Sequence, residues 1–157
     1  MDNLENLRMW VNRQLSQKQK KINDYKKFFI EENNDFSDMN TQNVIKCYNT
    51  FLSDFMTLTD DEAEIQALKR IENVFISAEG SEEVLLMGLI YERDSFIMGT
   101  NLFLETVDLD FNSELLVNSE LPVGYDFKNK TSIMQDSIKC IEIFTKAINI
   151  LEGKTEE

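Results

Sequence analysis

The sequence predicts a mainly α-helical protein that folds as a single domain over residues 1–157, an irregular bundle of four to five helices with a long N-terminal helix. One proline and five glycines among 157 residues leave few breaks in regular elements, which favours helices. Apolar residues also recur at steps of three, four or seven, the period of an amphipathic helix. The length fits one domain, since domains commonly hold roughly 100–150 residues.

The first element is the long N-terminal helix, predicted over residues 2–33. One apolar stripe follows it for about four heptads. The stripe consists of Leu4, Leu7, Val11, Leu15, Ile22, Tyr25 and Phe29. At 1.5 Å per residue the helix is roughly 45 Å long, more than a small domain is wide. We therefore expect several helices of the same chain, or a second copy of the chain, to cover it.

Two more helices are predicted before residue 81. Residues 39–58 repeat the helical period of apolar residues. Thr59 to Glu62 then has the pattern of a capping box, in which the threonine hydroxyl accepts the N–H of Glu62 and the glutamate reaches back. We therefore expect a new helix to begin there and to end at Gly80, because glycine commonly terminates helices.

The last third of the chain has a weaker pattern. Residues 82–103 favour a helix, because Leu and Met outnumber β-branched residues there and Ser81 can cap its start. A last helix is predicted over residues 131–152 and ends at Gly153. These two helices complete the predicted bundle.

Residues 107–112 instead show a period of two. Val107, Leu109 and Phe111 alternate with polar residues, which is typical of a strand at the edge of a sheet. Residues 115–117 are apolar and could pair with it. A small β-hairpin near residues 103–118 is therefore the alternative to a longer helix.

Charge is distributed unevenly along the chain, whose net charge is −13. Residues 1–30 carry seven Lys/Arg and three Asp/Glu, whereas the other 127 residues carry nine and twenty-six. A basic amphipathic helix can meet nucleic acid, an anionic membrane or an acidic protein. The strongly negative total opposes binding to phosphates. We therefore expect the N-terminal lysines to face solvent or to complement the acidic body of the same protein.

The absence of histidine excludes most catalytic constellations. It removes the Ser-His-Asp triad, the Cys-His pair and zinc sites that contain histidine, and the chain has no Gly-rich phosphate loop. Asp108 to Glu114 resembles the start of a calcium loop, but Ser113 and Ser119 stand where that loop needs Gly and Glu. We therefore expect no cofactor, no metal and no catalytic residue.

The chain is expected to act inside the cell, in the cytoplasm. Its longest apolar run has eight residues, far fewer than the ~20 that span a membrane. The first residues lack the pattern of a secretory signal. Two cysteines, Cys47 and Cys140, fit a reducing compartment as free thiols. A membrane partner is not expected.

These observations favour a non-enzymatic acidic protein that binds and inhibits or neutralises another macromolecule. We expect an inhibitor of the immunity or anti-defence kind that bacteria and their phages make, acting on a basic or nucleic-acid-binding protein and not on nucleic acid directly. An acidic surface can imitate nucleic acid, or can complement a basic face and speed association. The expected partner-binding residues are exposed acids: Asp60, Asp61, Glu64, Asp108, Asp110 and Glu114.

Three alternatives remain at this stage. One is an oligomeric structural module, or a secretion or assembly chaperone, that forms a homodimer through the helix at residues 2–33. Another is an enzyme whose chemistry rests on carboxylates or a metal held by them. The simplest is that the negative charge only keeps the protein soluble.

Overall fold

The computed structural model describes residues 2–31, 40–112 and 126–154. These residues form four helices and no strand, which confirms the mainly α-helical bundle with a long N-terminal helix. The helices are α1 (Asn3–Glu31), α2 (Thr41–Ser77), α3 (Glu82–Asn112) and α5 (Phe127–Leu151). At 1.5 Å per residue the 37 residues of α2 make a rod of roughly 55 Å.

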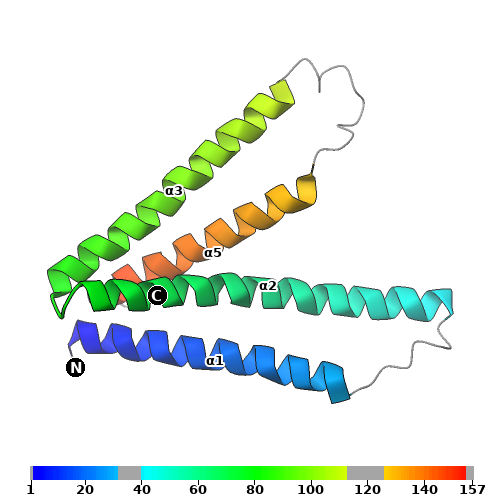
Figure 1. Ribbon diagram of the computed structural model, residues 1–157, viewed down its shortest axis with the longest axis horizontal. Helices are drawn as coiled ribbons and strands as arrows, with labels where there is room; N and C mark the ends of the chain where they lie inside the picture. Colours follow the sequence, from blue (N-terminus) through cyan, green and yellow to red (C-terminus); the bar gives the residue numbers. More distant parts are fainter. Residues whose placement is uncertain (1, 32–39, 113–125, 155–157) are drawn as a thin grey trace.

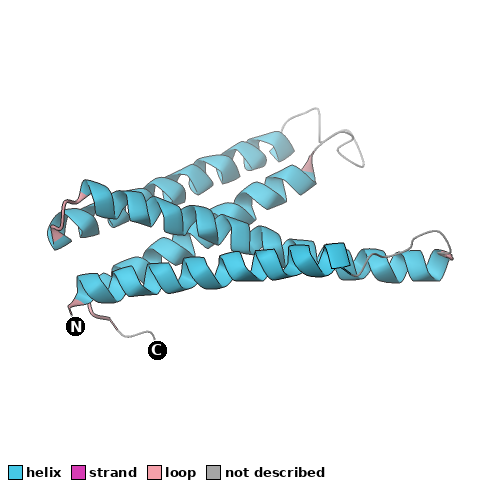
Figure 2. Ribbon diagram, turned by 60° about the horizontal axis from the view of Figure 1, so that its bottom comes forward, coloured by secondary structure: helices cyan, strands magenta, loops and turns pink. Residues whose placement is uncertain are grey.

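The four helices converge at one end and diverge at the other. Figure 1 shows α1 lying along α2 and α3 lying beside α5, with the two pairs meeting at the left and separating toward the right. Figure 2, in which the molecule is turned, shows the described part of the chain as long helices and short loops. The start of α1, the end of α2, the start of α3 and the end of α5 share the converged end. We call the other end the open end.

The hydrophobic core occupies the converged end. Its largest fully buried side chains come from all four helices. They are Leu7, Val11, Leu68, Ile71, Leu85, Leu89, Phe144 and Leu151. The Phe144 ring stacks on the Phe96 ring with 5.9 Å between centroids. Because burial of apolar surface is the main stabilising term in folding, this end holds the bundle together.

One continuous helix, α2, replaces the two helices predicted over residues 39–58 and from Thr59 to Gly80. The capping box at Thr59 was a wrong prediction. The Thr59 hydroxyl donates to the backbone carbonyl of Phe55 at 2.8 Å, one turn earlier in the same helix. Threonine inside a helix commonly makes this bond, so the residue pattern of a cap does not by itself require a helix start.

The predicted end of α2 is confirmed. The helix stops at Ser77, and a turn follows in which Glu79 and Gly80 have φ values of +49° and +84°. Glycine adopts this left-handed conformation without a steric penalty. The Ser81 hydroxyl then accepts the N–H of Val84 at 3.3 Å and caps α3.

The predicted helix over residues 82–103 is confirmed and extends to Asn112. The strand predicted over residues 107–112 was therefore wrong, and its proposed mate at residues 115–117 lies outside the described residues. Three alternating residues are too few to outweigh the helical spacing of half-buried Phe103, Val107 and Asp110.

The last helix, α5, begins earlier than residue 131, where the sequence predicts its start. The Asp126 side chain accepts the backbone N–H of Asn129 at 2.9 Å, so the helix starts at Phe127. Its end at Leu151 agrees with the predicted stop, because Gly153 takes a positive φ of +68° just beyond it.

Candidate partner-binding surface

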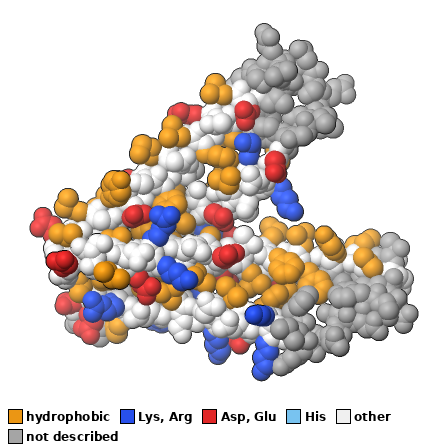
Figure 3. All heavy atoms as spheres, viewed as in Figure 1, with side chains coloured by type: hydrophobic (Ala, Val, Ile, Leu, Met, Phe, Trp, Pro, Cys, Tyr) orange, Lys and Arg blue, Asp and Glu red, His pale blue; other side chains and the backbone are white. Residues whose placement is uncertain are grey.

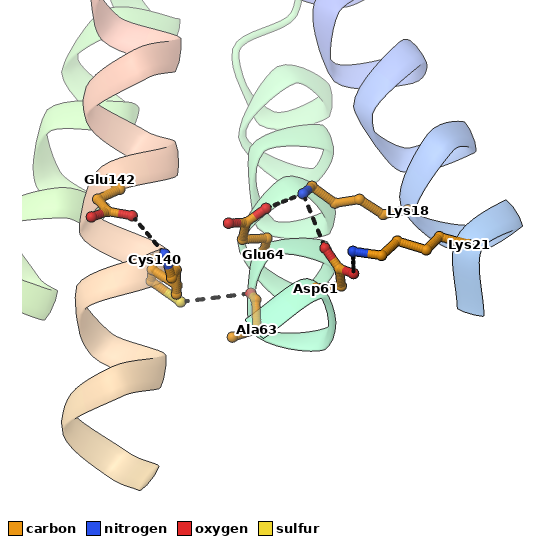
Figure 4. A network of polar contacts seen from close by, with 8 residues as sticks. Lys18, Lys21, Asp61, Ala63, Glu64, Cys140 and Glu142 are labelled. Atoms are coloured by element: carbon orange, nitrogen blue, oxygen red, sulfur yellow. Dashed lines mark hydrogen bonds and ion pairs between the residues drawn. The ribbon is translucent and has the colours of Figure 1, made fainter. Parts of the chain in front are cut away.

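Two of the predicted partner-binding acids are held by lysines of α1. Lys18 Nζ lies 3.4 Å from Asp61 Oδ1 and also pairs closely with Glu64, while Lys21 Nζ lies 2.7 Å from Asp61 Oδ2 (Figure 4). Asp61 is only 7% exposed. The expected exposure of Asp61 was therefore wrong. These two basic residues complement acids of the same chain, one of the two roles expected for the N-terminal lysines.

Asp60 instead lies close enough to Asp136 of α5 to act on its charge, as does Glu62 of α2. Desolvation and the negative charges of Glu62 and Asp60 raise the pKa of Asp136 above its usual range. One turn closer to the core, the Cys140 thiol donates to the Ala63 carbonyl at 3.9 Å (Figure 4). These three carboxylates therefore form an acidic cluster shared by α2 and α5.

The other predicted acids belong to a different region. Asp108 is exposed near the end of α3, and Asp110 Oδ2 lies 3.8 Å from Lys130 Nζ of α5. Lys130 Nζ also lies 5.3 Å from the centroid of the Phe103 ring. Glu114 falls outside the described residues. The five predicted acids that the structure describes therefore do not form one site.

No metal centre or membrane span emerges from the described part of the chain. Within residues 2–31, 40–112 and 126–154, no three His, Cys, Asp or Glu side chains come together in a group that could hold a metal ion. None of the four described helices combines the length and the apolar character that crossing a bilayer requires.

Cys140 is a buried free thiol on the α2-facing side of α5. Burial raises the pKa of this thiol above its usual range, the positive charge of Arg70 opposes that shift, and Asp136 adds to it. A reactive cysteine needs a lowered pKa and access to solvent. Cys140 therefore acts as a small apolar residue of the core.

A long line of exposed apolar side chains lies on α3. Six large apolar side chains follow one another along this helix at steps of three, four or seven residues, and each is between 51% and 72% exposed. They are Val84, Met87, Tyr91, Met98, Leu102 and Leu109, and we call them the α3 stripe. Figure 3 shows apolar side chains along the outer edge of α3 from the converged end to the open end.

The α3 stripe does not belong to the face that packs on the core. The core-facing side of α3 carries Leu85 and Leu89, continued by the half-buried Phe96 and Phe103. Each of these residues is offset from the stripe by more than a quarter turn at 100° per residue. The helix is therefore apolar on two faces, whereas a surface helix normally has one apolar face.

A shallow groove of about 530 Å³ runs beside the stripe, between α2 and α3. Its lining residues are Arg70, Asn73, Val74, Ser77, Gly88, Tyr91 and Glu92. Arg70 Nη1 lies 3.3 Å from Glu92 Oε2, and its guanidinium stands 5.3 Å from the Phe96 ring centroid. Gly88 lets the Val74 side chain of α2 approach α3 closely, and Tyr91 of the α3 stripe lines the same groove.

A second apolar area lies on the first half of α2. Val44, Ile45, Tyr48, Leu52 and Met56 are about half exposed or more. Ile45, Leu52 and Met56 share the helix face of Ala63, since their spacing is seven, four and seven residues. Ala63 is buried where α2 meets α5, so this stripe is covered at the converged end and exposed at the open end.

Sequence reasoning missed the α3 stripe. Its spacing is visible in the sequence, but the sequence does not say which of the two apolar faces of α3 packs inside. Comparisons with protein families, curated proteins and solved structures found no match for this chain. The function is therefore inferred from the exposed side chains of the protein alone.

Proposed function

We propose that this chain is a non-enzymatic protein that binds another protein and inhibits it. The α3 stripe carries this proposal. It is a line of six exposed apolar side chains, spaced by three, four or seven residues, that extends over most of a 31-residue helix. Exposed apolar side chains that gather on one face, instead of being scattered singly, are typical of sites where proteins associate.

A helix that is apolar on two faces requires cover on both. The core and α5 cover one face of α3, and the bundle leaves the stripe to solvent. Fully burying a side chain of this size, relative to leaving it exposed, contributes roughly 1.5–3 kcal/mol, and the half-exposed side chains of the stripe would gain part of it. Partner binding is the simplest way to gain this energy.

An inhibitor of the immunity or anti-defence kind fits the chain better than a mimic of nucleic acid. A mimic needs carboxylates that are free to replace phosphates, whereas Asp61 and Glu64 are paired with Lys18 inside the bundle. An apolar surface with acids around it instead suits a basic protein, whose charge would speed association.

Dimerisation through α1 receives less support. The stripe on α1 that would form such a seam is used within the chain, since Leu7 and Val11 are 0% and 2% exposed in the core. A homodimer through another face remains a testable outcome, and light scattering on the purified chain measures it.

The experiment is a quantitative pull-down from extracts of the native cells with matched variants. Met98→Glu places a charge in the α3 stripe, while Leu104→Glu places the same charge on another exposed position of α3. We expect the unmodified chain and Leu104→Glu to retain one partner protein in equimolar amount, and Met98→Glu to lose it. Equal retention by all three chains, or retention by none, would contradict the proposal. Circular dichroism verifies that both variants remain folded.

A further inference from the structure

We infer that the α3 stripe binds an amphipathic helix of the partner, with basic residues along one flank of that helix. This inference rests on the proposed function and specifies the chemistry of the partner. Three observations carry it: the spacing of the stripe, the charges beside it, and the poor fit of a second copy of the chain.

The spacing of the stripe matches a helix. Val84, Tyr91 and Met98 are seven residues apart, and Leu102 and Leu109 continue at the same interval. A seven-residue repeat is the pattern by which one helix packs along another. From Val84 to Leu109 the stripe is about 38 Å long at 1.5 Å per residue. A partner helix of roughly seven turns would cover it, whereas a single loop would cover only part of it.

The charges beside the stripe are negative. Glu83, Asp94, Glu105 and Asp108 follow one line along α3, because steps of eleven and three residues return to nearly the same helix face. All four side chains are exposed. Asp94 also contacts Arg93 of the same helix, with Nη2 2.9 Å from Oδ1. In paired helices, residues that flank the apolar seam select partners by charge, so this flank favours Lys and Arg.

A second copy of the chain fits this surface poorly. In an antiparallel pair of α3 helices the same four acids would face each other across the seam, and like charges at flanking positions disfavour such pairing. Over residues 3–27, the described side chains of the basic helix α1 offer no matching exposed apolar face. Within those residues, Met9 is the one large apolar side chain that is exposed. The acids likewise disfavour an anionic membrane.

Two synthetic peptides test the inference directly. Both are 25-residue amphipathic helices with leucine at the seam positions, one with lysine and the other with glutamate at the flanking positions. Binding of each to the full chain is measured by fluorescence anisotropy at low and moderate salt. We expect the lysine peptide to bind about tenfold more tightly at low salt, and the difference to shrink as salt screens the charges.

Variants of the chain separate docking on the stripe from general attraction between opposite charges. Met98→Glu makes the chain more negative, so a non-specific electrostatic complex would tighten, whereas docking on the stripe would weaken at least about tenfold. Glu83→Lys combined with Glu105→Lys should reverse the preference toward the glutamate peptide. Leu104→Glu, on another face of α3, should bind the lysine peptide as tightly as the unmodified chain or slightly more tightly.

Several results would overturn the inference. In the peptide assay they are equal binding of the two peptides, or tighter binding of the lysine peptide to Met98→Glu than to the unmodified chain. A homodimer that dissociates on the Met98→Glu substitution, or binding to anionic lipid vesicles that depends on Met98, would also overturn it. The proposed function can survive such a result. If Met98→Glu abolishes partner capture while the peptides bind equally, the protein-binding role stands and only the basic helix is wrong.

Discussion

Replacing Gly88 by alanine should destabilise the protein, although alanine is the better helix former. A Cβ atom built at residue 88 would lie 2.6 Å from Cγ1 of Val74, so α2 and α3 would have to move or Val74 would have to change its rotamer. The β-branched valine has little freedom to do so inside a helix. Overpacking costs typically 1–3 kcal/mol, and helix propensity returns about 1 kcal/mol. We expect a net loss of roughly 1 kcal/mol.

A second glycine of α3 provides the matched control. Nothing lies within 4 Å of a Cβ atom at Gly99, so Gly99→Ala should stabilise the protein by about 0.5–1 kcal/mol. In a Val74→Ala background the obstructing methyl group is absent. Gly88→Ala should then become neutral or stabilising, which corresponds to a coupling energy of at least about 1 kcal/mol between the two positions.

Urea unfolding followed by far-UV circular dichroism measures these differences, with the slope of the transition compared between variants. The reasoning fails if Gly88→Ala stabilises the unmodified chain as much as Gly99→Ala does. It also fails if the effect of Gly88→Ala is the same with valine and with alanine at position 74. Either result would mean that α2 and α3 do not approach as closely as described.

Three further outcomes follow from the polar and titratable groups. Lys18→Met removes one counter-charge of Asp61 and should lower the free energy of unfolding by about 1–3 kcal/mol, whereas Lys20→Met at an exposed position should change it by less than about 0.5 kcal/mol in the same urea titration. Asp136→Asn should stabilise the protein at neutral pH by less than about 1 kcal/mol. The raised pKa of Asp136 means that its charged form opposes folding, so the gain should vanish as pH falls below 3.8, the ordinary pKa of an aspartate. A gain independent of pH would contradict this account. In a Cys47→Ser chain, iodoacetamide should modify Cys140 at least about tenfold more slowly in the folded than in the urea-unfolded state; equal rates would show that the thiol is accessible.

The fold class could be predicted from the sequence because glycine and proline, which interrupt helices, are rare along the whole chain. Long helices can therefore form without special residues to start or stop them. The observed helix α1 and the turn at Gly80 agree with the helices and the stop predicted from the apolar spacing. The errors are at positions where a local pattern has two physical solutions. The hydroxyl of Thr59 can cap a new helix or bond to the preceding turn, and only the packing of α2 decides between them.

The candidate site was less accessible to sequence reasoning. Exposure of an acid depends on what packs against it, and Lys18 reaches Asp61 across 43 residues of sequence. Asp108 was placed correctly at the surface, but as part of an acidic set and not as the flank of an apolar stripe. The burial of Leu85 and Leu89 defines the inner face of α3, and only the structure shows that the apolar stripe lies on a different face.

The position of the core at one end of long helices also determines how the amide hydrogens exchange with solvent. Amides of α2 near Leu68 and Ile71 are in the core cluster and should exchange only when the whole protein unfolds. Amides near Val44 and Leu52, in the same helix, should exchange through local opening of the open end. A ligand that covers α3 should slow exchange near Met98 and Leu109 while leaving Val44 unchanged. Exchange measured residue by residue therefore reports which face a partner occupies, before the partner itself is identified.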